Sequence, residues 1–83
     1  MAEAQFNLGN LLAAREDIAE AEFHWKQAIR GRPDYGEARY NYAIILAQSG
    51  RYSEARNQLN AALKADPSFK AARDVLEQLD GLR

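Results

Sequence analysis

The 83-residue chain contains no cysteine, one histidine, one tryptophan and one methionine. Without cysteine, the chain has no disulfide framework, no thiolate metal site and no cysteine nucleophile. A single histidine, His24, has no second imidazole or thiolate to complete a metal site and no partner with which to form a catalytic triad. We therefore expect no metal, no cofactor and no catalytic residues.

The sequence also has little net charge of either sign. Eleven basic and twelve acidic residues leave a formal net charge of −1. Most nucleic-acid binders gain affinity from a basic excess, so no nucleic-acid partner is expected. No apolar run approaches the roughly 18–20 residues of a membrane span, and no basic-then-apolar leader opens the sequence. The simplest interpretation is a soluble, cytoplasmic protein that does not insert into a membrane.

Prolines are limited to two, Pro33 and Pro67. When the sequence is shifted against itself by 34 places, the two prolines align, and residues 2–35 and 36–69 are identical at nine positions. A third, partial copy begins at Lys70. Internal self-similarity at such a period is typical of stacked helical repeats. We expect one domain, 1–83, with repeat one at 2–35, repeat two at 36–69 and a final helix at 70–80.

Each repeat is predicted to form two helices. Only five glycines interrupt a sequence rich in alanine, and apolar residues recur at helical spacing, as in Ala21, Trp25, Ala28 and Ile29. Asp17 with Glu20 and Asp34 with Glu37 have the spacing of capping boxes, and Gly50 can supply a left-handed turn. The fold class is therefore all-α, with helices expected at 2–15, 18–31, 36–49, 52–65 and 69–80.

The repeat resembles the tetratricopeptide repeat (TPR), a 34-residue helix–turn–helix motif. Repeat one carries the pattern residues Leu8, Gly9, Leu12, Ile18, Ala21, Trp25, Ala28 and Pro33, and repeat two carries Tyr42, Ala43, Leu46, Gly50, Tyr52, Ala55, Leu59, Ala62 and Pro67. The resemblance covers residues 2–69 and continues to about Asp80. It implies a right-handed α-solenoid of two repeats and a fifth, capping helix.

Three positions depart from the family pattern. Glu16 stands where glycine is usual, which costs on the order of 1 kcal/mol if the backbone is left-handed there. Gln5 and Arg39 are polar at a place that usually carries a bulky residue. The packing of that place must therefore be supplied in another way.

The adjacent His24 and Trp25 are interpreted differently. Trp25 occupies the aromatic core place of the repeat, with Leu59 as its counterpart. His24 aligns with Gln58 on the outward side of the same helix and is expected to have no role. On this basis, Trp25→Ala should unfold or nearly unfold the domain, whereas His24→Ala should have almost no effect.

The resemblance implies a binding surface on the concave side, lined by the first helix of each repeat. Transferred to this sequence, the groove positions that we favour are Phe6, Asn7, Asn10, Tyr40, Asn41, Ile44, Gln48 and Asp74. Asn10 and Asn41 could bridge the backbone of a partner. TPR clamps for acidic peptide tails also need basic residues, but those places hold Phe6, Ala71 and Val75. A carboxylate clamp is therefore not expected.

Two classes of function remain. The first is a non-catalytic module that binds a peptide or protein in the groove. The second is an assembly module that forms a homo-oligomer through an uncapped N-terminal end, or that belongs to a longer TPR array. RNA binding by related helical repeats is disfavoured by the period of the repeat, by the retained proline place and by the slightly acidic charge.

Overall fold

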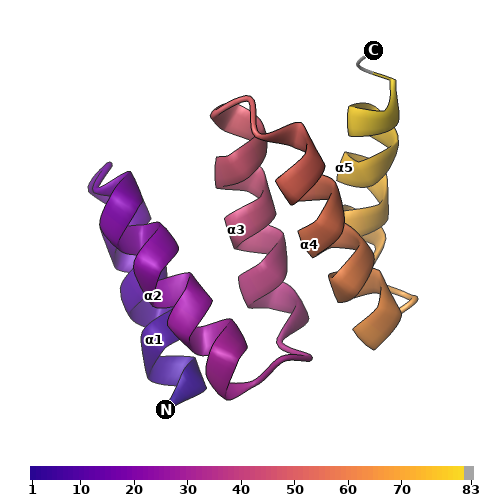
Figure 1. Ribbon diagram of the computed structural model, residues 1–83. Coiled ribbons are helices and arrows are strands. Elements are labelled where there is room, and N and C mark those ends of the chain that lie inside the picture. The colour runs from indigo at the N-terminus through magenta and orange to yellow at the C-terminus, as the bar shows by residue number, and fades with distance from the viewer. Residues whose placement is uncertain (82–83) are drawn as a thin grey trace.

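The computed structural model describes residues 1–81, which fold into five α-helices (Figure 1). Each helix begins and ends within one residue of the range predicted from the sequence, and the expected all-α fold is confirmed. The helices are α1 (Ala2–Ala14), α2 (Ile18–Gly31), α3 (Gly36–Gln48), α4 (Tyr52–Ala65) and α5 (Lys70–Asp80).

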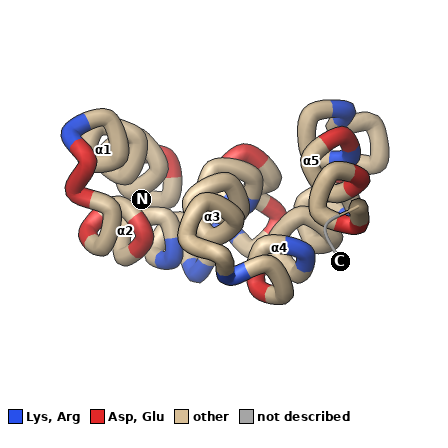
Figure 2. Tube along the Cα trace, turned by 90° about the horizontal axis from the view of Figure 1, so that it is seen from above, with Lys and Arg blue, Asp and Glu red and all other residues tan. Residues whose placement is uncertain are grey.

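Helices that are consecutive in the sequence pack against each other. The pairs α1–α2 and α3–α4 form two hairpins, and contacts of α2 with α3 and of α4 with α5 join the successive units. Seen from above, α1, α3 and α5 lie along one side of a curved row, with α2 and α4 along the other (Figure 2). Because α1 and α5 stand forward of α3 on their side, the first helices of the units line a concave face.

The interior consists largely of alanine with a few large side chains. Leu46 and Leu59 are the largest fully buried residues, and Trp25 is only 3% exposed. Small side chains at the crossing points let helix backbones approach closely, so the large residues fill the remaining space. The alanines with no exposed surface are Ala21, Ala28, Ala38, Ala43, Ala55, Ala62 and Ala72.

The turn inside each hairpin has the same geometry in both repeats, even though its sequence differs. Glu16 has φ +64° and Gly50 has φ +79°, so both adopt the left-handed conformation. The Asp17 N–H donates to the Leu12 carbonyl at 2.9 Å, and the equivalent Arg51 N–H donates to the Leu46 carbonyl at 2.8 Å. These bonds satisfy carbonyl groups at the helix end, and Glu16 adopts a conformation that favours glycine.

The capping boxes expected at Asp17 and Asp34 do not form. Within residues 1–81, no helix has a side-chain hydrogen bond from its N-cap residue. Asp17 is the N-cap of α2 through its backbone only, and α3 starts one residue later than a cap at Asp34 requires, with Tyr35 as N-cap. Asp34 instead lies 3.6 Å from Arg32, so its carboxylate pairs across the turn.

None of the helices described combines the length and the apolar character that crossing a membrane requires.

Candidate functional site

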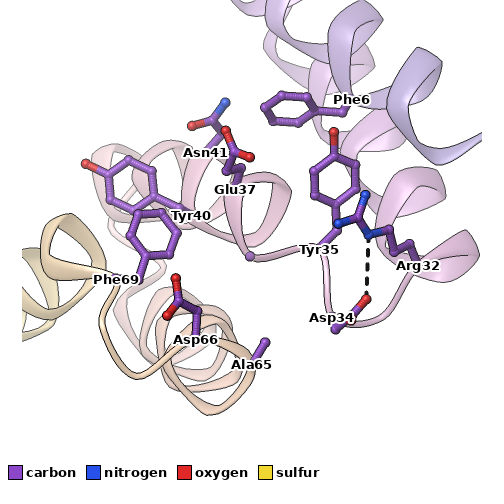
Figure 3. A pocket seen from close by; sticks show the side chains of 11 residues that line it. Phe6, Arg32, Asp34, Tyr35, Glu37, Tyr40, Asn41, Ala65, Asp66 and Phe69 are labelled. Carbon is purple, nitrogen blue, oxygen red and sulfur yellow. Dashed lines mark ion pairs between the residues drawn. The ribbon is translucent and has the colours of Figure 1, made fainter.

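Two adjoining hollows indent the concave face. The larger, of about 640 Å³, lies where α1, the α2–α3 turn, the start of α3 and the α4–α5 turn meet (Figure 3). Its lining residues are Phe6, Arg32, Asp34, Tyr35, Gly36, Glu37, Tyr40, Asn41, Ala65, Asp66 and Phe69. The smaller, of about 490 Å³, is lined by Asn10, Ala13, Trp25, Tyr40, Asn41, Ile44 and Ile45. Tyr40 and Asn41 border both hollows, so the two adjoin along α3.

The structure brings together five of the eight groove positions expected from the sequence. Phe6 borders the larger hollow, Asn10 and Ile44 border the smaller, and Tyr40 and Asn41 border both. The other three line neither hollow. Asn7, Gln48 and Asp74 are exposed, and the Asp74 carboxylate accepts a hydrogen bond from Lys70 Nζ at 2.9 Å.

Asn10 directs its amide oxygen to groups of the protein itself, and the expectation that its amide also bridges a partner stays a prediction. Its Oδ1 accepts a hydrogen bond from Trp25 Nε1 at 3.1 Å and another from Asn41 Nδ2 at 2.8 Å. The buried indole N–H is thereby satisfied, as such groups usually are. Asn41 directs its N–H to Asn10, and no hydrogen bond from residues 1–81 reaches its own amide oxygen.

The walls of the larger hollow are two aromatic pairs that the repeat duplicates. Phe6 and Tyr35 have ring centroids 5.0 Å apart at an interplanar angle of 40°. Tyr40 and Phe69, their counterparts one repeat later, are 5.3 Å apart at the same angle. In each pair, one ring lies on the first helix of a unit (α1 or α3). The other ring belongs to the residue just before the first helix of the following unit (α3 or α5). The hollow therefore has an aromatic wall on either side.

Charged groups surround these rings. Arg32 places its guanidinium carbon 4.4 Å from the Tyr35 ring centroid and pairs with Asp34. Glu37 and Asp66 also border the hollow (Figure 3). The Asp66 Oδ1 accepts hydrogen bonds from the Ser68 hydroxyl at 2.6 Å and the Ser68 N–H at 3.0 Å. Three carboxylates against one guanidinium make the rim acidic.

The protonation of two lining groups follows from their surroundings. The hydrogen bonds from the Ser68 hydroxyl and N–H lower the pKa of Asp66, so this carboxyl group stays ionised. Burial raises the pKa of Tyr35, and the nearby Glu3 and Glu37 carboxylates raise it further. Tyr35 therefore remains a neutral phenol.

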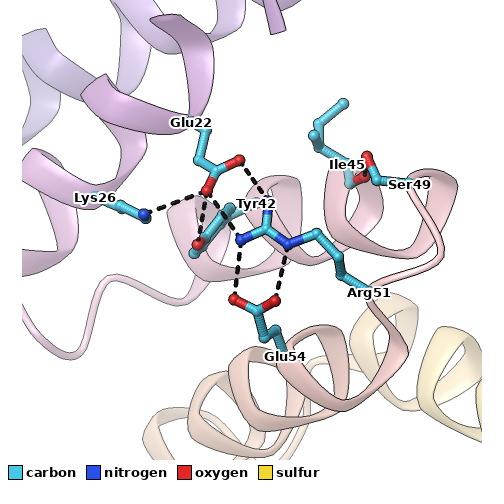
Figure 4. Close-up of polar contacts among 7 residues, drawn as sticks. All are labelled: Glu22, Lys26, Tyr42, Ile45, Ser49, Arg51 and Glu54. Atoms are coloured by element: carbon cyan, nitrogen blue, oxygen red, sulfur yellow. Dashed lines mark hydrogen bonds and ion pairs between the residues drawn. The ribbon is translucent and has the colours of Figure 1, made fainter. Parts of the chain in front are cut away.

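A polar network joins the two repeats behind the groove. Glu22 of α2 accepts hydrogen bonds from Arg51 Nη1 at 3.0 Å and from the Tyr42 hydroxyl at 3.2 Å, and it pairs with Lys26 at 3.2 Å (Figure 4). Arg51 also donates to Glu54 at 2.8 Å. Since Glu22 belongs to repeat one whereas Tyr42 and Arg51 belong to repeat two, the network sets how the two hairpins meet.

The network changes how its members titrate. Burial alone raises the pKa of Glu22, but the hydrogen bonds from Arg51 and Lys26 outweigh it and leave the pKa below its usual value. Burial raises the pKa of Tyr42, and the adjacent Glu22 carboxylate raises it further. Glu22 is thus ionised, and the Tyr42 hydroxyl donates to it.

The junction between repeat two and α5 is made differently. Arg56, which takes the place of Glu22 in the second repeat, pairs with Asp80 at 3.2 Å and donates to the Leu79 carbonyl at 3.2 Å. The second helix of each hairpin thus carries the residue that forms the junction, which is acidic in repeat one and basic in repeat two. In both cases this residue pairs with one of opposite charge on the following unit.

His24 is not a bystander, contrary to the sequence-based expectation. Its Nδ1 donates to the Gln5 amide oxygen at 2.6 Å, between α2 and α1. The equivalent pair of repeat two also forms, because Arg39 donates to the Gln58 amide oxygen at 2.8 Å. The polar residues Gln5 and Arg39 therefore join the two helices of each hairpin through hydrogen bonds, in place of the usual apolar contact. The expectation that Trp25 lies in the core is correct.

The sequence reasoning missed the turn residues of the larger hollow. The groove positions expected from the sequence include neither Tyr35 and Phe69 nor Arg32 and Asp66, all of which line the hollow. A signal was present, because the aromatic residues recur one period apart as two matched pairs. Among the described residues, no group of three or more histidine, cysteine, aspartate or glutamate side chains could hold a metal ion.

Comparison with known proteins supports the repeat assignment. A search of curated proteins gives no significant match. The tetratricopeptide repeat family model matches residues 12–79, which is most of the chain and spans α2, α3, α4 and nearly all of α5. On the strength of this match and of the duplicated hairpins, the chain belongs to the tetratricopeptide repeat family.

Proposed function

We propose that the protein is a non-catalytic interaction module that holds an extended peptide segment in the groove along its concave face. Tetratricopeptide repeats generally mediate contacts between proteins. The observation that carries the proposal is that the two hollows adjoin along α3 and share Tyr40 and Asn41 as lining residues. Two adjoining hollows with aromatic walls suit a chain segment that runs across α3.

The lining offers two kinds of contact. The aromatic pairs provide large contact area at a low cost in side-chain entropy, and aromatic residues are enriched where interfaces gain most of their affinity. The Asn41 amide oxygen can accept a backbone N–H of the ligand, since its N–H group is already directed to Asn10. Its orientation is fixed before binding, which lowers the entropic cost of forming that contact.

The charges of the lining favour binding over catalysis. A carboxyl group that acts as a general acid needs a raised pKa, whereas hydrogen bonds from Ser68 lower the pKa of Asp66. Asp34 is paired with Arg32. These groups are arranged as fixed charges rather than as groups that exchange protons.

The proposal is tested by selecting binders from a random peptide display library on the purified protein. Selected peptides should lose at least tenfold in affinity for the Tyr40→Ala, Asn41→Ala double variant. The matched control is Tyr52→Ala with Asn57→Ala, which removes the same two side-chain types from exposed positions of α4. Circular dichroism establishes that both variants remain folded. Equal loss in both variants, or no enrichment of any peptide, would refute groove binding.

A second candidate function, assembly of two copies, is favoured by the outer face of α1. Leu8 and Leu11 are 38% and 49% exposed. At the equivalent positions of α3, Tyr42 is only 4% exposed and contacts α2, and Ile45 is partly buried against the core. The same face of the repeat is thus covered in α3 and open in α1. Exposed apolar surface of this kind often marks an interface.

The geometry favours pairing of α1 with α1 of a second copy around a twofold axis. In each copy α2 is covered by α3 and α4 by α5, whereas α5 carries the exposed charged residues Glu77 and Asp80. The face of α1 is therefore best matched by itself, in an isologous contact. Sedimentation velocity over a hundredfold concentration range should detect a dimer that Leu8→Gln with Leu11→Gln abolishes. A wild-type protein that stays monomeric throughout would refute this function.

A further inference from the structure

We infer that the larger hollow receives a cationic side chain, namely the guanidinium of an arginine presented by the bound peptide. This inference rests on the proposed function of the groove and adds the chemistry of its ligand. It is carried by a comparison of the two aromatic pairs, because one pair already holds an arginine of the protein itself and the other does not.

The first aromatic pair shows how this molecule binds a guanidinium. Arg32 lies over Tyr35, with its guanidinium carbon 4.4 Å from the ring centroid, and its Nε is 3.6 Å from Asp34. A cation within about 6 Å of an aromatic face is attracted by the negative charge density of the ring. A guanidinium is also planar, so it can stack on a ring and pair with a carboxylate at the same time.

The second aromatic pair has equivalent rings, but the charged residue beside it has the opposite sign. Phe69 takes the place of Tyr35 one repeat later, and the place of Arg32 is taken by Asp66. Figure 3 shows Asp66 near Phe69 among the residues that line the hollow. A carboxylate therefore replaces the resident cation beside the equivalent ring. The place that Arg32 fills at the first turn has no cation of the described residues at the second.

Carboxylates are available to a cation at this place. Asp66 receives both Ser68 hydrogen bonds on Oδ1, and no hydrogen bond from residues 1–81 reaches its Oδ2. Glu37 borders the same hollow and forms no ion pair with another described residue. With Asp34 paired with Arg32, Glu37 and Asp66 leave two uncompensated negative charges in the lining of the hollow.

Two other arginines of the protein, Arg39 and Arg73, do not line the hollow and do not neutralise its negative charge there. Arg39 donates to the Pro33 carbonyl at 2.8 Å, and the equivalent Arg73 donates to the Pro67 carbonyl. Neither residue borders the hollow. Complementary charge and aromatic stacking therefore favour an arginine of the ligand and disfavour an acidic segment.

The direct test is a nuclear magnetic resonance titration of the labelled protein with Nα-acetyl-arginine amide. The matched probe is Nα-acetyl-citrulline amide, which has nearly the same shape and no charge. The arginine probe should shift the ring resonances of Tyr40 and Phe69 and should bind at least fivefold more tightly than the citrulline probe. Equal shifts with both probes, or arginine-induced shifts confined to other residues, would overturn the inference.

Three variants locate the site. Asp66→Asn keeps an oxygen that can accept the Ser68 hydrogen bonds and removes the charge, and Glu37→Gln removes the other charge. Each should weaken arginine binding by about twofold to fivefold. Asp66→Arg places a guanidinium where Arg32 stands in the first turn and should abolish binding. The control Glu20→Gln removes an exposed carboxylate from the first turn of α2, away from the hollow, and should have no effect.

Peptide selection separates this inference from the proposed function. If display selects peptides that depend on Tyr40 and Asn41 but carry no excess of arginine, the groove binds peptides and the inference is wrong. If selected peptides carry an arginine whose change to citrulline weakens binding by at least fivefold in the wild type but not in Asp66→Asn, the inference is supported. A failure to select any peptide refutes the proposed function, while the arginine titration still decides the chemistry of the hollow.

Discussion

Gly9 lies directly against the indole ring of Trp25. A Cβ atom added to Gly9 would fall 2.5 Å from Trp25 Cδ1, far inside normal contact distance. The equivalent positions of repeat two hold Ala43 and Leu59, which are both fully buried in the same core cluster. A larger residue on one helix thus accompanies a smaller residue on the other. The two crossings are thus filled by different combinations of side-chain size, glycine with tryptophan in one repeat and alanine with leucine in the other.

We predict that Gly9→Ala is destabilising in the wild type and stabilising in a Trp25→Leu background. In the wild type, the overlap with a buried ring should cost about 1–2 kcal/mol net, even though alanine is the better helix former. With leucine at residue 25, the crossing matches Ala43–Leu59 and the helix propensity of alanine dominates. Urea unfolding of the four proteins measures the coupling. The same sign of effect in both backgrounds would contradict the packing argument.

Glu16→Gly should stabilise the protein by about 1 kcal/mol. Glu16 has φ +64°, a conformation that glycine adopts without the steric cost of a side chain, and Gly50 already occupies the equivalent turn. Thermal and urea unfolding check the change. The reverse substitution at the equivalent turn, Gly50→Glu, should lower the free energy of unfolding by a similar amount. A neutral result for both would mean that the left-handed turns carry no strain.

Glu22→Gln should cost about 1–2 kcal/mol near pH 7, because it removes the charge that Arg51 and Lys26 contact. The pKa of Glu22 is lowered by folding, so the ionised form stabilises the folded state above the unfolded pKa of about 4.5. That contribution is lost as the pH falls through the folded pKa. The stability difference between wild type and variant should therefore shrink below about pH 4.5. Denaturant unfolding at several pH values, with Glu20→Gln as control, measures it.

His24→Ala should be measurably destabilising, in contrast to the expectation from the sequence. The loss of the hydrogen bond to Gln5, which leaves an unpaired amide, should cost about 0.5–1.5 kcal/mol. A double-mutant cycle with Gln5→Ala isolates the pair, and its coupling energy should account for most of the loss. Additive effects of the two changes would show that the contact contributes nothing.

The repeat period explains why much of the fold could be predicted from one sequence. Aligning Pro33 with Pro67 fixes the register of every other position, so the helix ends, the buried Trp25 and the unusual Glu16 all follow from local patterns. Helix periodicity and turn chemistry depend on residues that are near one another in the sequence.

The polar contacts between helices could not be predicted in the same way. The contacts His24–Gln5 and Glu22–Arg51 depend on the rotation of one helix against another, which no periodicity specifies. The hydrogen bond from Trp25 Nε1 to Asn10 Oδ1 could not be predicted for the same reason. Such interactions are set by packing geometry.

The candidate site was predicted only in the part that lies on first helices. Tyr40, Asn41 and Phe6 were expected there, and they do border the larger hollow. Asp66 and Phe69 come from a turn, and that turn meets α3 only when the units stack. Proximity of this kind is a property of tertiary structure and leaves little trace in a local pattern.

The reversal of charge between Glu22 and Arg56 has a consequence for the order of the units. Glu22 on the second helix of the first hairpin pairs with Arg51, the residue just before the second helix of the next hairpin. Arg56 on the second helix of the second hairpin pairs with Asp80 at the end of α5. If the hairpins exchanged places, Arg56 would meet Asp17, the residue aligned with Arg51, and Glu22 would meet Asp80. Like charges would then oppose each other before α5. The joint with α5 is therefore the one that distinguishes the two orders, because the exchange would leave an attractive pair between the hairpins and a repulsive pair at α5.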